Sequence, residues 1–421
     1  MEYGLIGARL GHSFSKPIHE ALNPNASYEL CPLPEEQQAR DFLAARAFSG
    51  INVTIPYKRL VMEYCDEIAP SAKAIGAVNT VTNRNGRLCG YNTDYDGFLE
   101  MARSAHIDFE GRRVLILGTG GTAHTVHAAV AAQGAAHVHH ASHSGTHGAL
   151  TYEQAIEQGG SFDILINTTP VGMYPDCDAS PVDLKDFPCL GGVLDVVYNP
   201  LKTELLCRAK ERGIPHAGGL RMLVAQAFYA QQYFQDKTLE RAQMDDIYRR
   251  LVEDRANLIL IGMPSCGKST VGKLCAEMLG KRFIDADEAL EQRTGKRISE
   301  ILRPGTEAAF RDLEEQVLAD LAKEGGCVIA TGGGAVLRGQ NMRRLRRGGV
   351  LIWLNRALEA LTPGGARPLS ATPEALQEQW HVRRPLYEAA AHASVNNDAS
   401  AQETAQKVKE IFHEILNREW P

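Results

Sequence analysis

A glycine-rich loop past the middle of the chain carries the strongest chemical signal. Residues 262–270 read Gly-Met-Pro-Ser-Cys-Gly-Lys-Ser-Thr and match the pattern G-x-x-x-x-G-K-[ST]. The apolar residues 258–261 before the loop predict a buried strand, and an amphipathic helix is expected from about Lys268. Backbone N–H groups of such a loop, with the positive end of the following helix, bind phosphate chains. The sequence therefore predicts a nucleoside-triphosphate site.

The polar residues of this phosphate loop (262–270) have separate tasks. Lys268 supplies a mobile cation for the β- and γ-phosphates, and the hydroxyl of Ser269 is a ligand for Mg²⁺. The residues expected to contact ATP are Gly262, Ser265, Cys266, Gly267, Lys268, Ser269 and Thr270.

Short segments after the loop indicate which substrate the kinase uses. They are Phe283-Ile284-Asp285-Ala286-Asp287, Glu307-Ala308-Ala309-Phe310-Arg311, Ala330-Thr331-Gly332-Gly333-Gly334-Ala335, Ala366-Arg367-Pro368-Leu369 and Arg383-Arg384-Pro385-Leu386-Tyr387. In this order, the segments resemble shikimate kinase over about residues 255–421. The resemblance implies a P-loop kinase domain with a parallel α/β fold like that of nucleoside-monophosphate kinases. It also implies phosphorylation of shikimate by ATP and Mg²⁺.

The resemblance also implies roles at the catalytic centre. Asp285 would support the Mg²⁺ that Ser269 approaches, and Asp287 would accept a hydrogen bond from the attacking hydroxyl. Arg367, in a lid between about residues 361 and 370, would contact ATP and neutralise charge on the phosphoryl group in transfer.

Other residues of these segments would bind the substrate. By the same resemblance, Arg311 and Arg383 bind the substrate carboxylate, for which the forked donors of arginine are suited. Gly332, Gly333 and Gly334 let the backbone approach the substrate ring closely.

Two residues depart from the family pattern. Thr306 precedes Glu307 where the family has glycine, and Cys266 lies in the phosphate loop where glycine or alanine is common. A thiol beside phosphates and Lys268 suggests that oxidation or alkylation inhibits the kinase and that ATP protects it.

The first hundred residues carry a second set of polar groups. Ser13 and Ser15 are two apart, so on an extended segment both hydroxyls point to one side and can bind a carboxylate. Ser15 is alternatively the N-cap of a helix that starts near Pro17. Alternating apolar residues predict a strand over 51–55, ended by a proline. Lys58 then follows a strand end, where ligands bind in open α/β sheets.

The order of segments in this region is specific. The serine pair is followed by Asn52-Val53-Thr54-Ile55-Pro56-Tyr57-Lys58, Gly76-Ala77-Val78-Asn79-Thr80 and Gly90-Tyr91-Asn92-Thr93-Asp94. Together they resemble shikimate dehydrogenase over about residues 1–250. The resemblance implies that the two serines hold the substrate carboxylate and that Lys58 and Asp94 flank the reacting hydroxyl or ketone. The further substrate contacts it implies are Thr54, Asn79, Asn92, Tyr198 and Gln226.

The lysine–aspartate pair suits carbonyl reduction. Reduction of a ketone needs a hydride on carbon and a proton on oxygen, and a pair such as Lys58 and Asp94 can hold and exchange that proton. We therefore expect Lys58 to be the proton donor.

A dinucleotide loop is predicted at residues 118–123, which read Gly-Thr-Gly-Gly-Thr-Ala. A buried strand over 114–117 precedes the loop, an alanine-rich helix follows through Ala132, and a second strand is expected near 136–140. Further apolar strands at 162–167 and 193–197 predict a doubly wound, Rossmann-like sheet. The expected cofactor contacts are Gly118, Gly120, Gly121, Thr122 and Ala123, with Met222 near the nicotinamide by resemblance.

The end of the second strand selects the cofactor. An acidic residue there binds the ribose diol of NAD, and an arginine suits the 2′-phosphate of NADP. This chain has Ser142, His143 and Ser144 instead. The missing acid favours NADP, held by these three residues and more tightly when His143 is protonated.

Seven of the 14 histidines lie between His124 and His147. A helical pair, His124 and His127, is three residues apart, but no cysteine or carboxylate spacing completes a tetrahedral site. For these histidines the sequence therefore predicts polar surroundings of the cofactor and no metal site.

Length and composition limit the number of domains and the classes of protein to which the chain can belong. At 421 residues the chain needs several domains. The net charge is −6 and no basic block stands out, which argues against nucleic-acid binding; the arginines of residues 343–347 read as a solvated helix face. Nine scattered cysteines, no signal-type start and no apolar run of 18 residues predict a cytoplasmic chain without a membrane partner.

We therefore predict two fused enzymes of consecutive steps. The expected domains are a substrate domain over 1–101 and 220–250, an NADP domain over 102–219 and a kinase domain over 255–421, with a charged helix over 231–254 before the kinase. Two alternatives remain: a quinate or shikimate dehydrogenase that uses NAD, and a nucleotide-responsive regulator with one inactive half. The sequence leaves a homodimer open.

Overall fold

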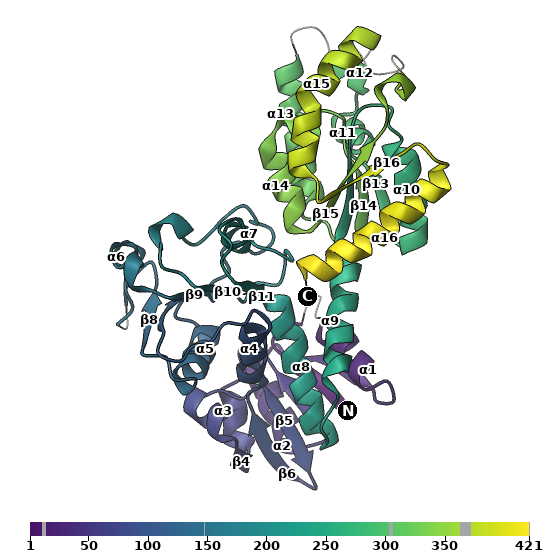
Figure 1. Ribbon diagram of the computed structural model, residues 1–421. Coiled ribbons are helices and arrows are strands. Elements are labelled where there is room, and N and C mark those ends of the chain that lie inside the picture. The colour runs from purple at the N-terminus through teal and green to yellow at the C-terminus, as the bar shows by residue number, and fades with distance from the viewer. Residues whose placement is uncertain (11–13, 147, 303–305, 363–371, 421) are drawn as a thin grey trace. The chain divides into compact units, whose positions relative to one another are not determined.

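The computed structural model describes residues 1–10, 14–146, 148–302, 306–362 and 372–420. The chain divides into two compact units, Met1–Tyr248 and Arg249–Pro421. Within the described ranges the strands form three sheets, two in the first unit and one in the second (Figure 1). Helices of these ranges are all too short or too polar to cross a bilayer.

The first sheet is mixed, with strand order β2-β1-β3-β5-β6-β4. Strand β1 pairs in parallel with β2 and β3, whereas β5 is antiparallel to both β3 and β6. Strands β1, β3 and β6 therefore end at the same edge, where β5 begins. The strands are β1 (Tyr3–Gly7), β2 (Tyr28–Pro32), β3 (Gly50–Val53), β4 (Glu67–Ile68), β5 (Thr80–Arg84) and β6 (Arg87–Tyr91). The helices of this part are α1 (Ser15–Leu22), α2 (Glu36–Ala45), η1 (Leu60–Tyr64), α3 (Pro70–Ile75), α4 (Thr93–Ser104), α8 (Gly219–Gln235) and α9 (Arg241–Arg255).

Strand β3 is shorter than predicted. It ends at Val53, and the side chain of Ile55, expected on its buried face, is 76% exposed. On the β5 side the ladder ends at Thr80, opposite Asn52. On the β1 side the pairing goes on, since the backbone N–H of Ala8 donates to the carbonyl of Ile55 at 3.2 Å. Residues 54 and 55 therefore have a strand neighbour on one side only. The prediction of a strand through residue 55 is therefore wrong.

The second sheet is parallel, with strand order β11-β10-β9-β7-β8. Residues 114–117 are fully buried, because helices of a doubly wound fold cover both faces of such a sheet. The strands are β7 (Arg113–Leu117), β8 (His137–Ala141), β9 (Ile164–Asn167), β10 (Gly192–Asp195) and β11 (His216–Gly218). Its helices are α5 (Gly121–Ala132), α6 (Tyr152–Glu157), η2 (Gly159–Ser161), η3 (Leu184–Asp186) and α7 (Glu204–Glu211). The predicted Rossmann-like arrangement is confirmed.

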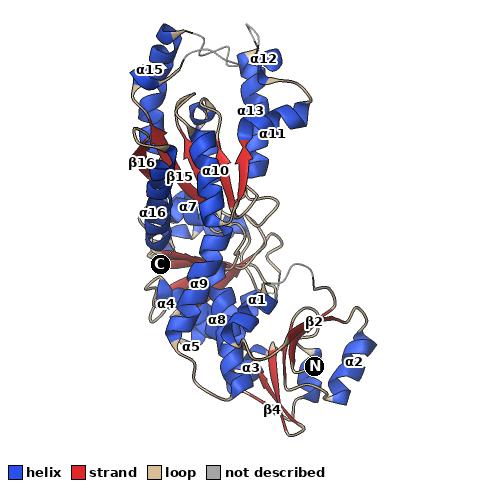
Figure 2. Cartoon of the chain, turned by 90° about the vertical axis from the view of Figure 1, so that its right-hand side faces the viewer, coloured by secondary structure: helices blue, strands red, loops and turns tan. Residues whose placement is uncertain are grey.

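The third sheet is also parallel, with strand order β13-β14-β12-β15-β16. The predicted strand before the phosphate loop is β12, and helix α10 begins at Lys268 and packs on the sheet (Figure 2). The strands are β12 (Asn257–Ile261), β13 (Arg282–Asp285), β14 (Cys327–Ala330), β15 (Gly349–Asn355) and β16 (Ala393–Asn396). The helices are α10 (Lys268–Leu279), α11 (Ala286–Thr294), α12 (Ile298–Ile301), α13 (Glu307–Leu321), η4 (Ala335–Leu337), α14 (Gly339–Arg347), η5 (Leu358–Ala360), α15 (Pro373–Ala390) and α16 (Ala401–Glu419).

The helix predicted over 231–254 is broken. Helix α8 ends at Gln235, and Asp236 caps it in the left-handed conformation with φ +50°. The Gln232 side chain then accepts a hydrogen bond from the backbone of Leu239 at 3.1 Å, which fixes the turn before α9 begins at Arg241. The prediction of one continuous helix is therefore wrong.

The arginines of residues 343–347 do not form a solvated face. Of the arginines on α14 only Arg343 is exposed; Arg347 is 3% exposed, and Arg344 pairs with Glu315 at 3.0 Å. Arg346 donates to the carbonyl of Ala390 at 3.0 Å. The prediction failed because charge alone does not show which carboxylates and carbonyls a helix packs against.

A buried histidine links α1 to the first sheet. His19 is 1% exposed, its ring stacks on Tyr28 with centroids 4.2 Å apart, and its Nδ1 accepts from Gln231 Nε2 at 3.0 Å. Burial lowers the pKa of His19 to about 3. The ring therefore stays neutral in the folded protein at any pH in ordinary use.

We predict that His19 makes the first unit sensitive to acid. The unfolded state binds a proton below pH 6.5 and the folded state does not until about pH 3, so stability is lost as pH falls through this window. Between pH 7 and 5 the loss is about 2 kcal/mol, and His19→Asn should abolish this part of it. Calorimetric unfolding of both proteins at the two pH values measures the difference.

The comparison with the variant is needed because other groups act in the opposite direction. Burial raises the pKa of Asp195 to about 7, so that carboxyl favours the folded state as pH falls. Trp353, Trp380 and Trp420 all lie in the second unit, so tryptophan fluorescence should report the same pH dependence for both proteins. Equal acid sensitivity of the calorimetric transition in wild type and variant would refute the assignment to His19.

Candidate active sites

The first unit contains a cavity of about 460 Å³, called here the first cavity. The residues around it come from the strand ends of the first sheet, from the dinucleotide loop and from helix α8. The predicted site residues that line it are Ser15, Thr54, Lys58, Asn79, Asp94, Thr122, Tyr198, Met222 and Gln226.

Lys58 and Asp94 form an ion pair in this cavity. The Nζ of Lys58 lies 2.5 Å from Oδ2 of Asp94, and the side chains are 30% and 22% exposed. Lys58 follows β3, and its carbonyl accepts from the backbone of Val78 at 2.8 Å. Asp94 lies in the first turn of α4. Both partners are thus held by backbone structure, and the pair is open to the cavity for proton exchange.

Asn79 and Asn92 have different positions. Asn79 is 3% exposed, lines the cavity, and accepts from the backbone N–H of Thr93 at 2.7 Å. Asn92 does not line the cavity. It is the N-cap of α4: its side chain accepts from the backbone of Tyr95 at 3.3 Å and donates to the carbonyl of Ala77 at 2.9 Å. The structure thus gives Asn92 a capping position, which an N-cap asparagine commonly has.

The serine pair is only partly described. Ser13 lies outside the described residues. Ser15 lines the first cavity, but it is the first residue of α1 and does not lie on an extended segment. It is not the N-cap either, because that position is held by Phe14, without a side-chain cap. Both local predictions for Ser15 are therefore wrong, although its place at the cavity agrees with the resemblance.

Arg9 and Asn52 line the first cavity and were not predicted. Asn52 is 5% exposed and accepts from the Tyr28 hydroxyl at 2.8 Å. It is two residues before Thr54 on an extended segment, and that spacing could have indicated it. Arg9 is exposed and, among the described residues, has no hydrogen bond or ion pair.

The dinucleotide loop fits a phosphate-bearing cofactor. Gly118 has φ +112°, and a Cβ there would lie 2.6 Å from Oγ1 of Thr168, so only glycine is accommodated. A Cβ on Gly120 or Gly121 would meet nothing within 4 Å, which leaves room for a pyrophosphate at the start of α5. Thr122 carries this loop to the edge of the first cavity, whereas Ala123 is buried in the core.

Two of the clustered histidines support this loop. His140 Nδ1 donates to the carbonyl of Gly118 at 3.0 Å, and His140 Nε2 lies 2.9 Å from His127 Nδ1, which therefore donates to it. Burial and the neighbouring His140 and His124 lower the pKa of His127. Within the described ranges, histidine, cysteine and carboxylate side chains form no group of three that could hold a metal.

The segment expected to select the cofactor follows β8, which ends at Ala141. Ser142 Oγ accepts from the backbone of Gly145 at 3.2 Å, and the ring of His143 lies 4.8 Å from that of Tyr152. Ser144 Oγ is 3.0 Å from the hydroxyl of Thr146. These three residues do not line the first cavity, so their role in 2′-phosphate binding stays a prediction.

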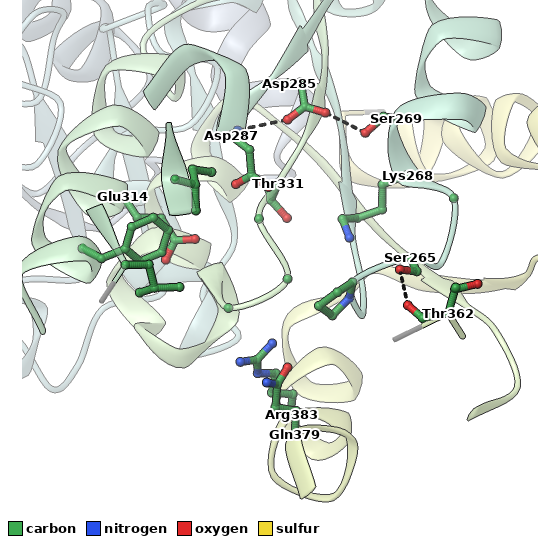
Figure 3. Close-up of a pocket in the computed structure, with 18 of the residues that line it drawn as sticks. Ser265, Lys268, Ser269, Asp285, Asp287, Glu314, Thr331, Thr362, Gln379 and Arg383 are labelled. Carbon is green, nitrogen blue, oxygen red and sulfur yellow. Dashed lines mark hydrogen bonds between the residues drawn. The ribbon is translucent and has the colours of Figure 1, made fainter. Parts of the chain in front are cut away.

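The second unit contains a cavity of about 410 Å³ around the phosphate loop, called here the second cavity (Figure 3). Arg367 lies outside the described residues, and Gly262 and Cys266 do not line the cavity. The predicted site residues that do line it are Ser265, Gly267, Lys268, Ser269, Thr270, Asp285, Asp287, Arg311, Gly332, Gly333, Gly334 and Arg383.

The side chains of Lys268 and Ser269 in the phosphate loop lie as expected. Lys268 is 8% exposed, and its Nζ donates to the carbonyls of Gly262 at 3.0 Å and Met263 at 2.9 Å. Ser269 Oγ donates to Asp285 Oδ2 at 2.6 Å, so these two oxygens are close enough to serve one Mg²⁺ together (Figure 3). Asp285 also caps α11 by accepting from the backbone of Asp287 at 3.0 Å.

Cys266 is not an accessible thiol. Its side chain is fully buried, and its Sγ lies 3.9 Å from Lys268 Nζ. The reason is the close packing behind the loop, where the carbonyl of Cys266 accepts from Asn397 at 2.8 Å. The hypothesis of direct alkylation is therefore not supported, because reactive cysteines need some exposure.

The predicted substrate arginines lie in the buried part of the second cavity. Arg311 and Arg383 are 8% and 5% exposed. Arg311 pairs with Glu314 at 2.7 Å and with Glu307 at 3.3 Å. Burial lowers the pKa of Arg383, and the nearby Arg311 adds to this effect, although Tyr387 opposes it. An anion between the two guanidinium groups would relieve their repulsion.

The glycine run is closely packed against these groups. A Cβ on Gly332 would lie 2.6 Å from Glu314 Oε1 and 2.8 Å from Asp287 Oδ1, and one on Gly334 would lie within 2.4 Å of the Arg311 guanidinium. The Tyr387 hydroxyl donates to the carbonyl of Gly333 at 2.5 Å. A side chain at Gly332 or Gly334 would therefore displace the carboxylates or the guanidinium that line the cavity.

Sequence reasoning missed Glu314, Gln379 and Arg356, which also line the second cavity. Glu314 is 4% exposed, and its Oε1 has no hydrogen-bond partner within the described part of the chain. Its position three residues after Arg311 on a helix could have indicated the pair. For Gln379 and Arg356 no local pattern indicates the cavity.

Comparison with known proteins identifies both units. The model of the shikimate dehydrogenase substrate-binding domain matches residues 5–81, and that of shikimate kinase matches residues 264–418. Shikimate dehydrogenase (NADP(+)) of Bacillus cereus strain G9842 is 39% identical over 249 residues, which are 54% of this chain and 90% of the relative.

Solved structures agree. A chorismate mutase/shikimate 5-dehydrogenase fusion protein from Clostridium acetobutylicum is 33% identical, with a TM-score of 0.56, over 60% of this chain and 97% of its own. Shikimate 5-dehydrogenase from Thermus thermophilus, in complex with NADP(H) and shikimate, is 32% identical, with a TM-score of 0.53, over 59% and 99%. The chain therefore belongs to the shikimate dehydrogenase family and is a fusion that also carries a shikimate kinase domain.

Proposed function

We propose that the chain catalyses two consecutive reactions. The first reduces 3-dehydroshikimate to shikimate with NADPH, and the second transfers a phosphoryl group from ATP to shikimate, giving shikimate 3-phosphate. The main support is that one chain has the Lys58–Asp94 pair beside Thr122 in the first cavity and the phosphate loop beside Asp287 in the second. The product of the first site is then the substrate of the second.

In the first reaction, bound NADPH supplies a hydride to the carbonyl carbon. Lys58 Nζ donates the proton that the carbonyl oxygen gains, so that ketone, hydride and proton give the alcohol. Asp94, 2.5 Å away, keeps the lysine oriented and charged before transfer. The dinucleotide loop would hold the pyrophosphate of this cofactor, Met222 would contact the nicotinamide, and Ser142, His143 and Ser144 would bind the 2′-phosphate.

The substrate is an anion, and the charges of the first cavity suit one. Its described charged residues are Arg9, Lys58 and Asp94, and the last two neutralise each other. Arg9 is therefore an uncompensated cation, and we assign it with Ser13 and Ser15 to the substrate carboxylate. The ring hydroxyls are bound by Thr54, Asn79, Tyr198 and Gln226.

In the second reaction, Asp287 accepts a hydrogen bond from the attacking hydroxyl. Lys268 and Arg367 would stabilise the phosphoryl group in transfer, and Ser269 with Asp285 would hold the Mg²⁺ that neutralises charge on the phosphates. Arg311 and Arg383 bind the substrate carboxylate, and the Gly332–Gly334 backbone contacts the ring.

We divide the chain accordingly. Residues 1–101 and 220–250 form the substrate domain of the dehydrogenase, 102–219 its NADP domain and 255–421 the kinase. The third sheet, with Asn257–Ile261 at its centre, is consistent with a kinase domain that begins near residue 255.

Lys58→Met should reduce NADPH-dependent reduction of 3-dehydroshikimate by roughly 10²-fold or more, because the proton donor is lost. Shikimate-dependent formation of ADP by the same protein should be unchanged and is the internal control. Lys73→Met, an exposed lysine of the same unit, should change neither rate. Retention of full reductase activity by Lys58→Met would show that the proton comes from another group.

Asp287→Asn should have the converse effect. Loss of the carboxylate that accepts from the attacking hydroxyl should lower the rate of ADP formation with shikimate by roughly 10²-fold or more, and reductase activity should remain. Glu288→Gln, at the exposed neighbouring position of α11, is the matched control. Equal kinase rates for the two variants would contradict the proposed role of Asp287.

Arg9→Gln should raise KM for shikimate, measured as its oxidation with NADP⁺, about fivefold. KM for shikimate methyl ester, which has no carboxylate charge, should change less than twofold. Arg59→Gln, an exposed arginine outside the cavity, controls for long-range charge. An equal effect on acid and ester would exclude a carboxylate contact.

A second substrate is tested in the same assay. Quinate with NAD⁺ is the rival pair, because no acidic residue or arginine follows β8 to decide between the cofactors. A higher kcat/KM for quinate with NAD⁺ than for shikimate with NADP⁺ would overturn the assignment.

A further inference from the structure

The first peptide group of the dinucleotide loop is bound by the end of strand β8. His140 Nδ1 donates to the carbonyl of Gly118 at 3.0 Å, and the N–H of Gly118 donates to the carbonyl of Ala141 at 2.8 Å. Gly118 has φ +112°, a conformation that glycine permits but does not enforce. The contacts with β8 therefore determine which way the peptide group between Gly118 and Thr119 is turned.

The orientation of this peptide group sets the direction of the first N–H in the loop. The bond is trans, so its C=O and N–H point in opposite directions. Because the Gly118 carbonyl is directed at His140, the N–H of Thr119 points away from His140. Within the described ranges this N–H has no hydrogen-bond partner. It is therefore available to a ligand.

The N–H groups that follow Thr119 are available as well. Helix α5 begins at Gly121, and the N–H groups of a first turn have no carbonyl four residues earlier to bind. A Cβ on Gly120 or Gly121 would meet nothing within 4 Å, so there is open space beside this backbone. Successive N–H groups bind an anion only when they converge on it. A turned peptide group after Gly118 would remove the first of them.

The sheet places the His140 side chain beneath helix α5. Strands β7 and β8 are parallel, and His140 is in register with Ile116. Ile116 packs in the core with Val126 and Val130 of α5. Residues in register point to the same face of a sheet, so His140 also faces α5. There His127 of this helix is its second hydrogen-bond partner.

The two hydrogen bonds of His140 define its tautomer. A carbonyl oxygen only accepts, so His140 Nδ1 must carry a hydrogen. The Nε2 of the neutral ring then accepts from His127 Nδ1, 2.9 Å away. Burial and the neighbouring His140 and His124 lower the pKa of His127, so the His127 ring is neutral above neutral pH. His127 thus stabilises the His140 tautomer that can donate to Gly118.

We propose that His140 is a positioning residue for the dinucleotide. Through the Gly118 carbonyl it directs the N–H of Thr119 at the cofactor's pyrophosphate, and His127 keeps its ring in the donating tautomer. The proposal rests on the NADP(H) cofactor of the proposed reductase but not on which substrate is reduced. It gives the paired histidines a role in cofactor affinity without any contact between their rings and the cofactor.

The test compares His140→Val, His140→Asn and the control His137→Val in the full chain. His137 is an exposed histidine of the same strand, and His137→Val should leave cofactor binding unchanged. His140→Val removes the donor, so Kd for NADP⁺, from calorimetric titration, should rise about five- to tenfold. Asparagine has an N–H on the atom that corresponds to Nδ1, so His140→Asn should keep Kd within about twofold of wild type.

The asparagine variant separates the hydrogen bond from packing. Both replacements of His140 remove the ring and its contact with His127. Equal weakening by the two would overturn the proposal, because loss of the ring and not of the donor would then be responsible. An unchanged Kd for His140→Val would overturn it as well.

Adenosine 2′-phosphate separates the loop from the rest of the cofactor site. It has the base, the ribose and the 2′-phosphate of NADP but no pyrophosphate. In displacement of NADP⁺ it should have the same Ki with His140→Val as with wild type. A rise in this Ki equal to the rise in Kd for NADP⁺ would contradict an action through the loop.

A double replacement tests the part assigned to His127. His127→Leu removes the donor to His140 Nε2 and should raise Kd for NADP⁺ about two- to threefold. Because His127 acts through His140, His127→Leu should have no further effect in the His140→Val protein. Effects that multiply in the double variant would refute the role of His127.

Failure of the proposed reductase reaction would look different. Wild-type protein that binds NADP⁺ but does not reduce 3-dehydroshikimate with NADPH would refute that reaction, whereas the titrations would still test His140. Equal melting temperatures of the variants and wild type would show that weaker binding is not caused by unfolding.

Discussion

The direction of the strands decides where chemistry is possible in this chain. In the first sheet, β1, β3 and β6 end at one edge and β5 begins there, so Ser15, Lys58, Asn79 and Asp94 meet although up to 79 positions separate them. In the third sheet the same rule brings the phosphate loop, Asp285 and the glycine run together. Parallel strands leave their loops and the N-termini of their helices at this edge, and these are the groups that bind anions.

A buried network of hydrogen bonds fixes the side chains at the binding edge of the first sheet. The Tyr28 hydroxyl donates to Asn52, Asn52 donates to Thr80 at 3.0 Å, and the Thr80 and Thr93 hydroxyls lie 3.0 Å apart. Asn79 accepts from the Thr93 backbone and so joins α4 to β5. Buried polar groups cost stability unless they are satisfied, so each bond limits the geometry of the next. The Asn52 and Asn79 side chains that line the first cavity are therefore held in place without a bound ligand.

Much of this could be predicted because the signals were local. The phosphate loop and the dinucleotide loop each have a strand before and a helix after them, and both contexts are present. The predictions were wrong where contacts with residues distant in the sequence determine burial or the end of a strand. The arginines of α14 pair with carboxylates and carbonyls, and Ile55 has a backbone partner on the β1 side but none on the β5 side. Arg356 could not be found because its place depends on the order of strands, which the sequence does not state.

The charges of the second cavity show why two anionic ligands can share it. Arg311 is held by Glu314 and Glu307, so its charge is partly compensated, whereas the pKa of buried Arg383 is lowered by desolvation and by Arg311. A carboxylate there gains from both guanidinium groups. On the side proposed for the polyphosphate lie Lys268 and the backbone of the loop, and Asp285 with Ser269 would hold the divalent cation there. By the proposed function each anion would have its own cations, and Mg²⁺ held at Asp285 would offset the repulsion between that carboxylate and the phosphates.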